Sequence, residues 1–161
     1  MNQHAVETTS HAKQMSGKYL IFRLGEETYG LDIMKVREIV SLVDITTVPR
    51  MPAFIRGVIN LRGRVIPVMD LSKRFGMPDS ARTAANCIIV VYVRDMEMGV
   101  IVDNVREVLY VPETDIEETP SFGVNVDTRF IMGIGKTGGT VTLLLNVDQV
   151  LSADETSSLN E

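Results

Sequence analysis

The chain contains two copies of one pattern, and this duplication limits the folds open to it more than any other feature. Residues 19–40 align without gaps on residues 88–109, and apolar positions match almost throughout. Residues 54–57 match residues 130–133 farther along, so the second copy is longer in the loop before this match. A repeat of this kind predicts two similar units that share their cores.

Short apolar runs rich in Val, Ile and Leu dominate both copies, and they are typical of β-strands. About five short strands per copy close a small barrel better than they form an open sheet, and closure removes exposed strand edges. We therefore expect a mainly β fold of two stacked or intertwined five-stranded β-barrels with a few short helices. The expected strands are residues 19–24, 58–61, 65–69, 87–93, 100–102 and 141–145.

Three short segments have helical features. Apolar residues fall at helical spacing in residues 33–40, which predicts a short helix there. Asp70 and Asn146 are good N-cap residues, so we expect further short helices at residues 71–75 and 147–151.

The two ends of the chain lack these patterns. Residues 1–17 are polar, which predicts a disordered leader, and the Ser-, Asp- and Glu-rich residues 152–161 predict a polar tail. Between them we expect a single folded domain at residues 18–151. Its first repeat covers about residues 18–80 and its second about residues 86–151.

Composition excludes several classes of protein. The 161 residues are 45% hydrophobic and 23% charged, values typical of a soluble globular domain. A net charge of −5 without any basic cluster argues against a nucleic-acid or anionic-membrane partner. The longest apolar run, residues 87–93, is too short to cross a bilayer, and the chain begins without a signal pattern. We therefore expect a cytoplasmic protein.

No catalytic or metal-binding constellation is visible in the sequence. His4 and His11 lie in the expected leader, which cannot hold a general base in a fixed geometry. Cys87 has no histidine partner, and clustered metal ligands are missing. Residues 133–138 have the glycine spacing of a dinucleotide loop, but an expected strand follows them instead of a helix. We therefore expect no enzyme activity, no cofactor and no metal, which leaves protein–protein binding as the leading class.

One hairpin differs between the two copies. Residues 57–71 predict a strand, a tight polar turn and a second strand, with Arg62 in the turn between two apolar runs. The second copy has Lys-Thr-Gly-Gly where the first has Asn60-Leu61-Arg62-Gly63, so the repeat keeps only the final glycine. The duplicated scaffold does not require an arginine in this turn, which makes Arg62 the strongest candidate for contact with a partner.

A resemblance to a known family rests on three segments: GVINLRGRVIPVMDL, YLIFRLGEETYGLDIMKVREI and ITTVPRMPAFI. Together they resemble the CheW-like family of bacterial chemotaxis coupling proteins, and the likeness covers nearly all of residues 18–151. This resemblance implies two five-stranded barrels, related to SH3-like and OB-like barrels and partly swapped between the halves.

The resemblance also implies a function. Members of this family are adaptors without enzyme activity that couple the cytoplasmic tips of methyl-accepting chemoreceptors to the regulatory domain of the histidine kinase CheA. The expected location is the cytoplasm, with recruitment to membrane-associated receptor arrays and no insertion into the membrane.

The family suggests a receptor-binding surface that combines a charge pair of Glu38 and Arg62 with apolar side chains. Apolar residues of the two matching segments could form a groove for an amphipathic helix, or some of them could belong to the core. The expected receptor-binding residues are Val36, Glu38, Ile39, Gly57, Asn60, Leu61, Arg62, Val105 and Val108.

The expected kinase-binding surface lies in two loops that carry apolar residues, which suggest contact with a partner. The candidates could instead pack as a lid on their own barrel. They are Pro49, Met51, Pro52, Phe54 and Phe122.

The sequence leaves two alternative functions open. A CheW-like adaptor for a different kinase pathway, such as surface motility, would have the same fold and a different partner. An OB-like nucleic-acid-binding protein would require a basic groove with stacking aromatics, and the chain is acidic and has no Trp.

Overall fold

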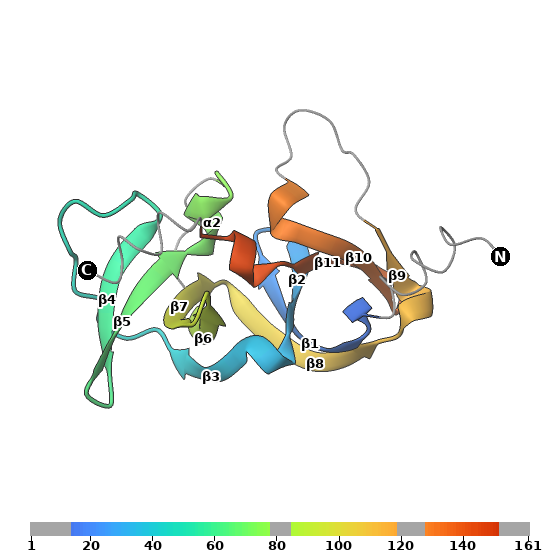
Figure 1. Ribbon diagram of the computed structural model, residues 1–161, viewed down its shortest axis with the longest axis horizontal. Coiled ribbons are helices and arrows are strands. Elements are labelled where there is room, and N and C mark those ends of the chain that lie inside the picture. Colours follow the sequence, from blue (N-terminus) through green and yellow to red (C-terminus); the bar gives the residue numbers. More distant parts are fainter. Residues whose placement is uncertain (1–13, 78–84, 119–127, 152–161) are drawn as a thin grey trace.

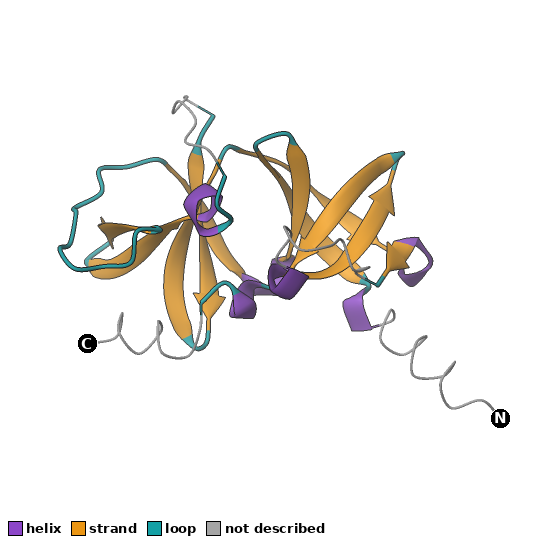
Figure 2. Cartoon of the chain, turned by 90° about the horizontal axis from the view of Figure 1, so that it is seen from above, coloured by secondary structure: helices purple, strands orange, loops and turns teal. Residues whose placement is uncertain are grey.

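The computed structural model describes residues 14–77, 85–118 and 128–151. In this part of the chain the fold consists of a six-stranded sheet in the order β8-β1-β2-β11-β10-β9 and a five-stranded sheet in the order β3-β6-β7-β5-β4. Figure 1 shows the two sheets at opposite ends of the long axis, and Figure 2 shows them as two groups of strands seen from above. The expected mainly β fold is confirmed.

The eleven strands of the described residues are short, and the helices named with them are single turns. The strands are β1 (Gly17–Leu24), β2 (Glu27–Asp32), β3 (Val36–Ser41), β4 (Ile55–Leu61), β5 (Arg64–Asp70), β6 (Cys87–Val93), β7 (Met96–Val102), β8 (Asn104–Val111), β9 (Ile116–Glu117), β10 (Ile131–Thr137) and β11 (Thr140–Leu145). The helical turns are α2 (Leu71–Arg74) and the 3-10 turns η1 (Ile33–Lys35), η2 (Glu113–Asp115), η3 (Thr128–Phe130) and η4 (Val147–Gln149).

The duplication is visible in the strand topology. Each sheet combines strands of both copies, because β1 and β2 of the first copy join β8 to β11, while β6 and β7 of the second copy join β3, β4 and β5. The strand orders of the two sheets correspond position by position. Even the lone bridge between Thr46 and Val58 has a counterpart, the pair of Glu117 and Ile134. The expected swap between the halves is therefore present.

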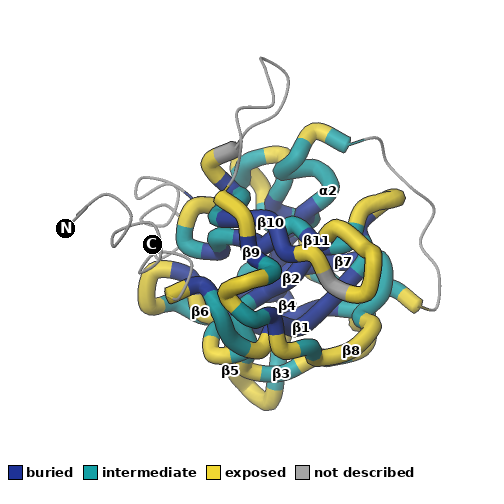
Figure 3. Tube along the Cα trace, turned by 90° about the vertical axis from the view of Figure 1, so that its right-hand side faces the viewer, coloured by how far each residue is buried: buried dark blue, intermediate teal, exposed yellow. Residues whose placement is uncertain are grey.

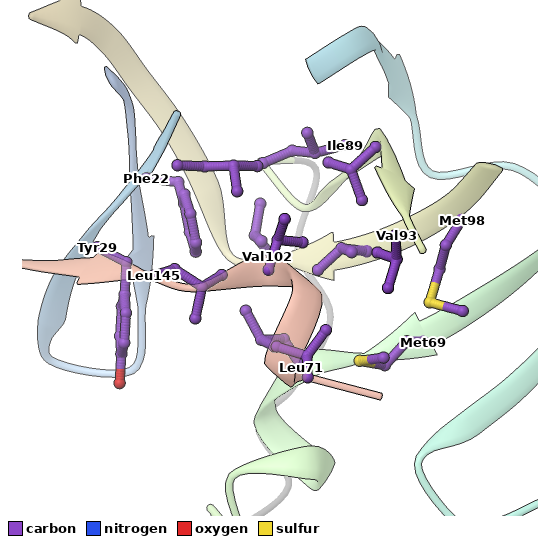
Figure 4. Packing of buried hydrophobic residues seen from close by; sticks show 14 of the residues in the cluster. Phe22, Tyr29, Met69, Leu71, Ile89, Val93, Met98, Val102 and Leu145 are labelled. Carbon is purple, nitrogen blue, oxygen red and sulfur yellow. The ribbon is translucent and has the colours of Figure 1, made fainter. Parts of the chain in front are cut away.

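Among the residues that the structure describes, the hydrophobic core consists of three clusters. The first lies against one face of the six-stranded sheet and takes side chains from its edge strands β8 and β9, and the second is built in the same way on the five-stranded sheet. Since both edges of a sheet contribute to one cluster, each sheet is rolled around its own core. The third and largest cluster contains buried side chains of both sheets, including Phe22 and Ile89 (Figure 4).

Successive buried side chains of β1 and of β6 alternate between two cores. Tyr19 and Ile21 of β1 belong to the cluster of the six-stranded sheet, whereas Leu20 and Phe22 belong to the central cluster. Successive side chains of a strand point to opposite faces, so a strand that reads as continuously apolar is buried on both sides. Figure 3 shows the buried segments gathered in the middle of the molecule.

The helix expected at residues 33–40 is wrong. Only Ile33–Lys35 forms a 3-10 turn, in which the Asp32 carboxylate accepts a hydrogen bond from the Met34 N–H at 3.0 Å. The chain then continues as β3, which pairs antiparallel with β6. The residues at helical spacing are β-branched, and a pleated surface with an available partner strand accommodates them better than an isolated helix does.

The other two helix predictions hold in part. Residues 71–74 form one turn of α-helix, and the Asp70 side chain accepts the Ser72 N–H at 3.1 Å as expected of an N-cap. Residues 147–149 form only a 3-10 turn, in which the Asn146 side chain makes no capping bond.

The expected leader ends earlier than residue 17. Met15 is buried in the cluster of the six-stranded sheet, its carbonyl accepts the Tyr19 hydroxyl, and Gly17 begins β1. Residues 1–13 of the expected leader and the expected tail at residues 152–161 lie outside the described residues.

Tyr19 makes the stability of the fold sensitive to alkaline pH. Burial, assisted by the charge of Asp32, raises the pKa of Tyr19 to about 12. Because an unfolded tyrosine ionises near pH 10, the folded state loses stability as the pH rises from about 10 to 12 and keeps it in full below that range. We expect Tyr19→Phe to flatten this decline in urea unfolding midpoints measured from pH 8 to 11. The exposed Tyr110→Phe is the control, and an unchanged slope for Tyr19→Phe would contradict the assignment.

Candidate partner-binding site

The turn between β4 and β5 has an unusual backbone. Arg62 has a φ of 52° and Gly63 a φ of 87°, so two successive residues are left-handed, as in the tight turns that join antiparallel strands. The Asn60 side chain accepts the Gly63 N–H at 2.8 Å. Asn60 therefore stabilises the turn, and this role could not be deduced from the comparison of the two copies.

The second copy has glycine at the position of Arg62. Gly138 and Gly139 have φ values of 55° and 81°, so the backbone of the two turns is nearly the same. A left-handed conformation costs a residue with a side chain about 1–2 kcal/mol. Arg62 occupies this position in spite of that cost, as Arg50, Arg94 and Asp95 do at their own positions.

Arg62 belongs to an ionic cluster of Arg37, Glu38, Arg62, Arg64 and Glu97. Arg62 pairs with Glu38, and Arg64 pairs with Glu97 while lying 3.9 Å from Glu38. The Arg37 guanidinium lies 3.9 Å from the Glu97 carboxylate. Three cations face two anions, so the cluster has a net positive charge.

The ionic cluster connects the two edges of the five-stranded sheet. Glu38 is in the edge strand β3, and Arg62 follows the opposite edge strand β4. The side chain of Arg62 is 64% exposed, whereas that of Glu38 is 28% exposed, so the carboxylate holds an arginine that faces solvent. Exposed pairs add only about 0–1 kcal/mol to stability. The pair is better suited to orient Arg62 toward a partner than to hold the barrel together.

The expected apolar groove residues divide into two kinds. Val36 and Val105 are half-buried against the central cluster, whereas Ile39 is 45% exposed and Val108 is 47% exposed. All four lie on the edge strands β3 and β8, which run along the lower side of the view in Figure 1. Leu61 is half-buried against the cluster of the five-stranded sheet.

Gly57 is buried and has no side chain to offer a partner. Its φ is 143°, and a β-carbon there would collide with the carbonyl group of Thr46. Thr46 and Val58 exchange two backbone hydrogen bonds of 2.9 Å at this point. Gly57 thus lets a loop cross close to β4.

The expected kinase-binding residues of the first loop are partly covered. Met51 and Phe54 pack against the central cluster, and the Arg74 guanidinium lies 4.4 Å from the centre of the Phe54 ring. Pro49 is exposed, and the Pro52 carbonyl accepts the Ile55 N–H at 2.9 Å. Met51 and Phe54 therefore act as a lid on their own core. Phe122 lies outside the described residues.

Sequence reasoning missed Arg37, Arg64 and Glu97 of the ionic cluster. Arg64 is in phase with Ile66 of β5, and Glu97 is in phase with Ile101 of β7, both of which face the core of the five-stranded sheet. A charged residue in phase with inward-facing positions is the signal that could have identified them.

Within residues 14–77, 85–118 and 128–151 no group of His, Cys, Asp and Glu could hold a metal ion. Burial raises the pKa of the Cys87 thiol, which lowers its reactivity. No described helix is long and apolar enough to span a membrane.

The fold defines a class of protein: a duplicated β module whose halves exchange strands around a shared core. The protein-family model of the CheW-like domain matches residues 18–155 of this chain. The chain belongs to the CheW-like family, which confirms the resemblance found in the sequence.

Individual relatives agree with this assignment. A chemotaxis protein CheW of Rhizobium meliloti is 37% identical over 150 residues, which cover 91% of this chain and 97% of the relative. One of Klebsiella aerogenes is 35% identical over 138 residues, covering 86% and 83%. The crystal structure of the scaffolding protein TtCheW from Thermoanaerobacter tengcongensis matches with a TM-score of 0.79 at 40% identity, covering 88% of this chain and 96% of that chain.

Proposed function

We propose that this protein is an adaptor without enzyme activity that couples chemoreceptors to the histidine kinase CheA in chemotaxis arrays. Its relatives carry the names chemotaxis protein CheW and scaffolding protein. The observation that carries the proposal is Arg62, which Glu38 holds at the surface in a backbone conformation where the second copy has glycine. The protein acts in the cytoplasm and is recruited to membrane-associated arrays by its partners.

The receptor surface combines the Arg62 guanidinium with exposed apolar side chains. Ile39 and Val108 supply apolar contact area, while the charge of Arg62 sets orientation and specificity toward the receptor tip. The remaining expected residues support this surface from beneath. Val36 and Val105 pack against the central cluster, and Leu61 packs against the core of the five-stranded sheet. Asn60 and Gly57 hold the backbone of the hairpin in place.

The kinase surface begins at the loop of residues 49–54. Pro49 is an exposed apolar residue of this loop, while Met51 and Phe54 fix the loop onto the core beneath it. Weak binding at each surface is sufficient in an array, because linked sites raise the effective concentration of every partner.

The proposal is tested by measuring CheA autophosphorylation with receptor, in the presence and absence of this protein. We expect kinase activity to depend on the adaptor when receptor is present and to stay at the basal level without receptor. Equal activity with and without the adaptor would overturn the proposal.

An adaptor for another kinase pathway would differ only in its partners. A pull-down with soluble receptor tips and isolated kinase regulatory domains separates the two, since retention of both partners by this chain is expected only of the chemotaxis adaptor.

A further inference from the structure

A cavity of about 560 Å³ opens at the end of the six-stranded sheet that carries the β10–β11 turn. We call it the mouth pocket. Ile21 and Leu109, which belong to the core of this sheet, contribute apolar surface, and the pocket is also lined by Thr28, Thr140 and the charged Arg106 and Glu107. A cavity of this volume is in the range of sites for small ligands and short peptide segments.

The other sheet shows what chemistry fits such a site. Arg106 and Glu107 are the repeat counterparts of Arg37 and Glu38. Both pairs lie beside an irregularity of the strand ladder, between Val36 and Glu38 in one sheet and opposite Glu107 and Val105 in the other. The backbone therefore gives Arg106 and Glu107 the same positions in their sheet that Arg37 and Glu38 have in theirs.

The middle of the ionic cluster has no equivalent in the mouth pocket. In the five-stranded sheet the charges alternate from Glu38 to Arg64, Glu97 and Arg37, with Arg64 and Glu97 between the other two. The repeat places Thr140 where Arg64 lies and Thr28 where Glu97 lies, and Gly138 replaces Arg62. Loss of these long side chains accounts for the cavity.

Arg106 and Glu107 are exposed residues in the lining of the mouth pocket. Among the residues that the structure describes, neither Arg106 nor Glu107 takes part in an ion pair. Two more charges of opposite sign line the pocket: Arg23, the repeat counterpart of Tyr92, and Asp115. The pocket is thus lined by two cations, two anions and the hydroxyl groups of threonines.

We propose that the mouth pocket binds a peptide segment of a partner that carries an arginine-like cation and a carboxylate side by side. The cation takes the place of Arg64 and pairs with Glu107, and the carboxylate takes the place of Glu97 and pairs with Arg106 and Arg23. Thr28 and Thr140 supply hydroxyl groups that can donate to the carboxylate or accept from the cation. This inference rests on the duplication and not on the proposed receptor or kinase surfaces.

The first test titrates the full chain with the blocked dipeptide acetyl-Arg-Glu-amide, observed by amide chemical shifts. We expect saturable shifts centred on Thr28, Arg106, Glu107 and Thr140. Replacing either charged residue of the dipeptide by Gln weakens binding by about two- to fivefold, as expected for partly exposed ion pairs. Glu107→Gln removes the preference for the Arg residue of the probe, and Arg106→Gln removes the preference for its Glu residue. Shifts that are absent, or that do not depend on the two charges, overturn the proposal.

The second test fills the pocket from within. Thr28→Glu and Thr140→Arg together rebuild the missing ion pair. The equilibrium constant of unfolding of the double variant is therefore expected to be about two- to fivefold smaller than the value obtained by multiplying the effects of the two single variants. The double variant is also expected to lose the dipeptide-induced shifts. Additive single effects together with undiminished binding of the dipeptide would refute the proposed placement of the charges, and a single variant that fails to fold leaves the dipeptide titration of the unmodified chain decisive.

Discussion

Arg62→Ala is expected to abolish retention on receptor tips and to leave the fold intact. The side chain is mostly exposed and its ion pair with Glu38 adds at most about 1 kcal/mol to stability, so the melting temperature should fall by less than about 4 °C. An arginine at the centre of an interface contributes about 2 kcal/mol or more to binding, which corresponds to a loss of roughly thirtyfold or more in affinity. Pull-down on receptor tips and thermal unfolding measured by circular dichroism provide the two readouts.

The chain offers a matched control for this experiment. Arg50 is also an exposed arginine with a positive φ, 64° against 52° for Arg62, and it lies outside the ionic cluster. Arg50→Ala repeats the loss of charge and the backbone conformation and should leave receptor binding unchanged. Arg62→Gly is a second control, since the relaxed backbone should offset the lost ion pair while binding is still lost. Normal receptor binding by Arg62→Ala, or failure of this variant to fold, would contradict the proposed role of Arg62 in receptor binding.

Gly57→Ala is expected to destabilise the fold by about 2–4 kcal/mol and to lower the melting temperature by roughly 5–15 °C. The new β-carbon would occupy the place of the Thr46 carbonyl, and the φ of 143° is one that L residues rarely adopt. Hydrogen exchange should report the damage first at the amides of Thr46 and Val58, whose two mutual bonds close the loop onto β4. Urea unfolding measures the global change.

Gly133 in the second copy is the matched control for Gly57. A β-carbon there would lie 3.3 Å from the Glu117 carbonyl oxygen and 3.0 Å from the flexible Met15 side chain, and Gly133 is not among the residues with positive φ. Gly133→Ala should therefore cost clearly less. Loss of receptor binding by Gly57→Ala should follow the fraction of unfolded protein. Lost binding by a fully folded variant would instead make Gly57 a direct contact, and equal costs at the two glycines would refute the packing argument.

Much of the site could be anticipated because its signals are local. Arg62 stands out once the two copies are compared, and its pairing with Glu38 followed from the family resemblance. The phase of Arg64 and Glu97 in their strands could have marked each of them as unusual, but their pairing could not be anticipated, because β5 and β7 are distant in sequence and become neighbours only in the folded sheet. The mouth pocket is of the same kind, since it lies in the six-stranded sheet, where threonines stand at the positions of Arg64 and Glu97.

The sequence by itself determined the duplication, the β character of both copies and the turn that carries Arg62, because apolar spacing and turn residues act within a few positions of the chain. Only the tertiary structure decided that residues 36–41 form a strand and not a helix, since pairing with β6 outweighs their helical spacing. It also decided which apolar residues of this strand and its counterpart stay exposed. Val36 and Ile39 are alike in sequence, and only the position of the second sheet half-buries Val36 and leaves Ile39 facing solvent.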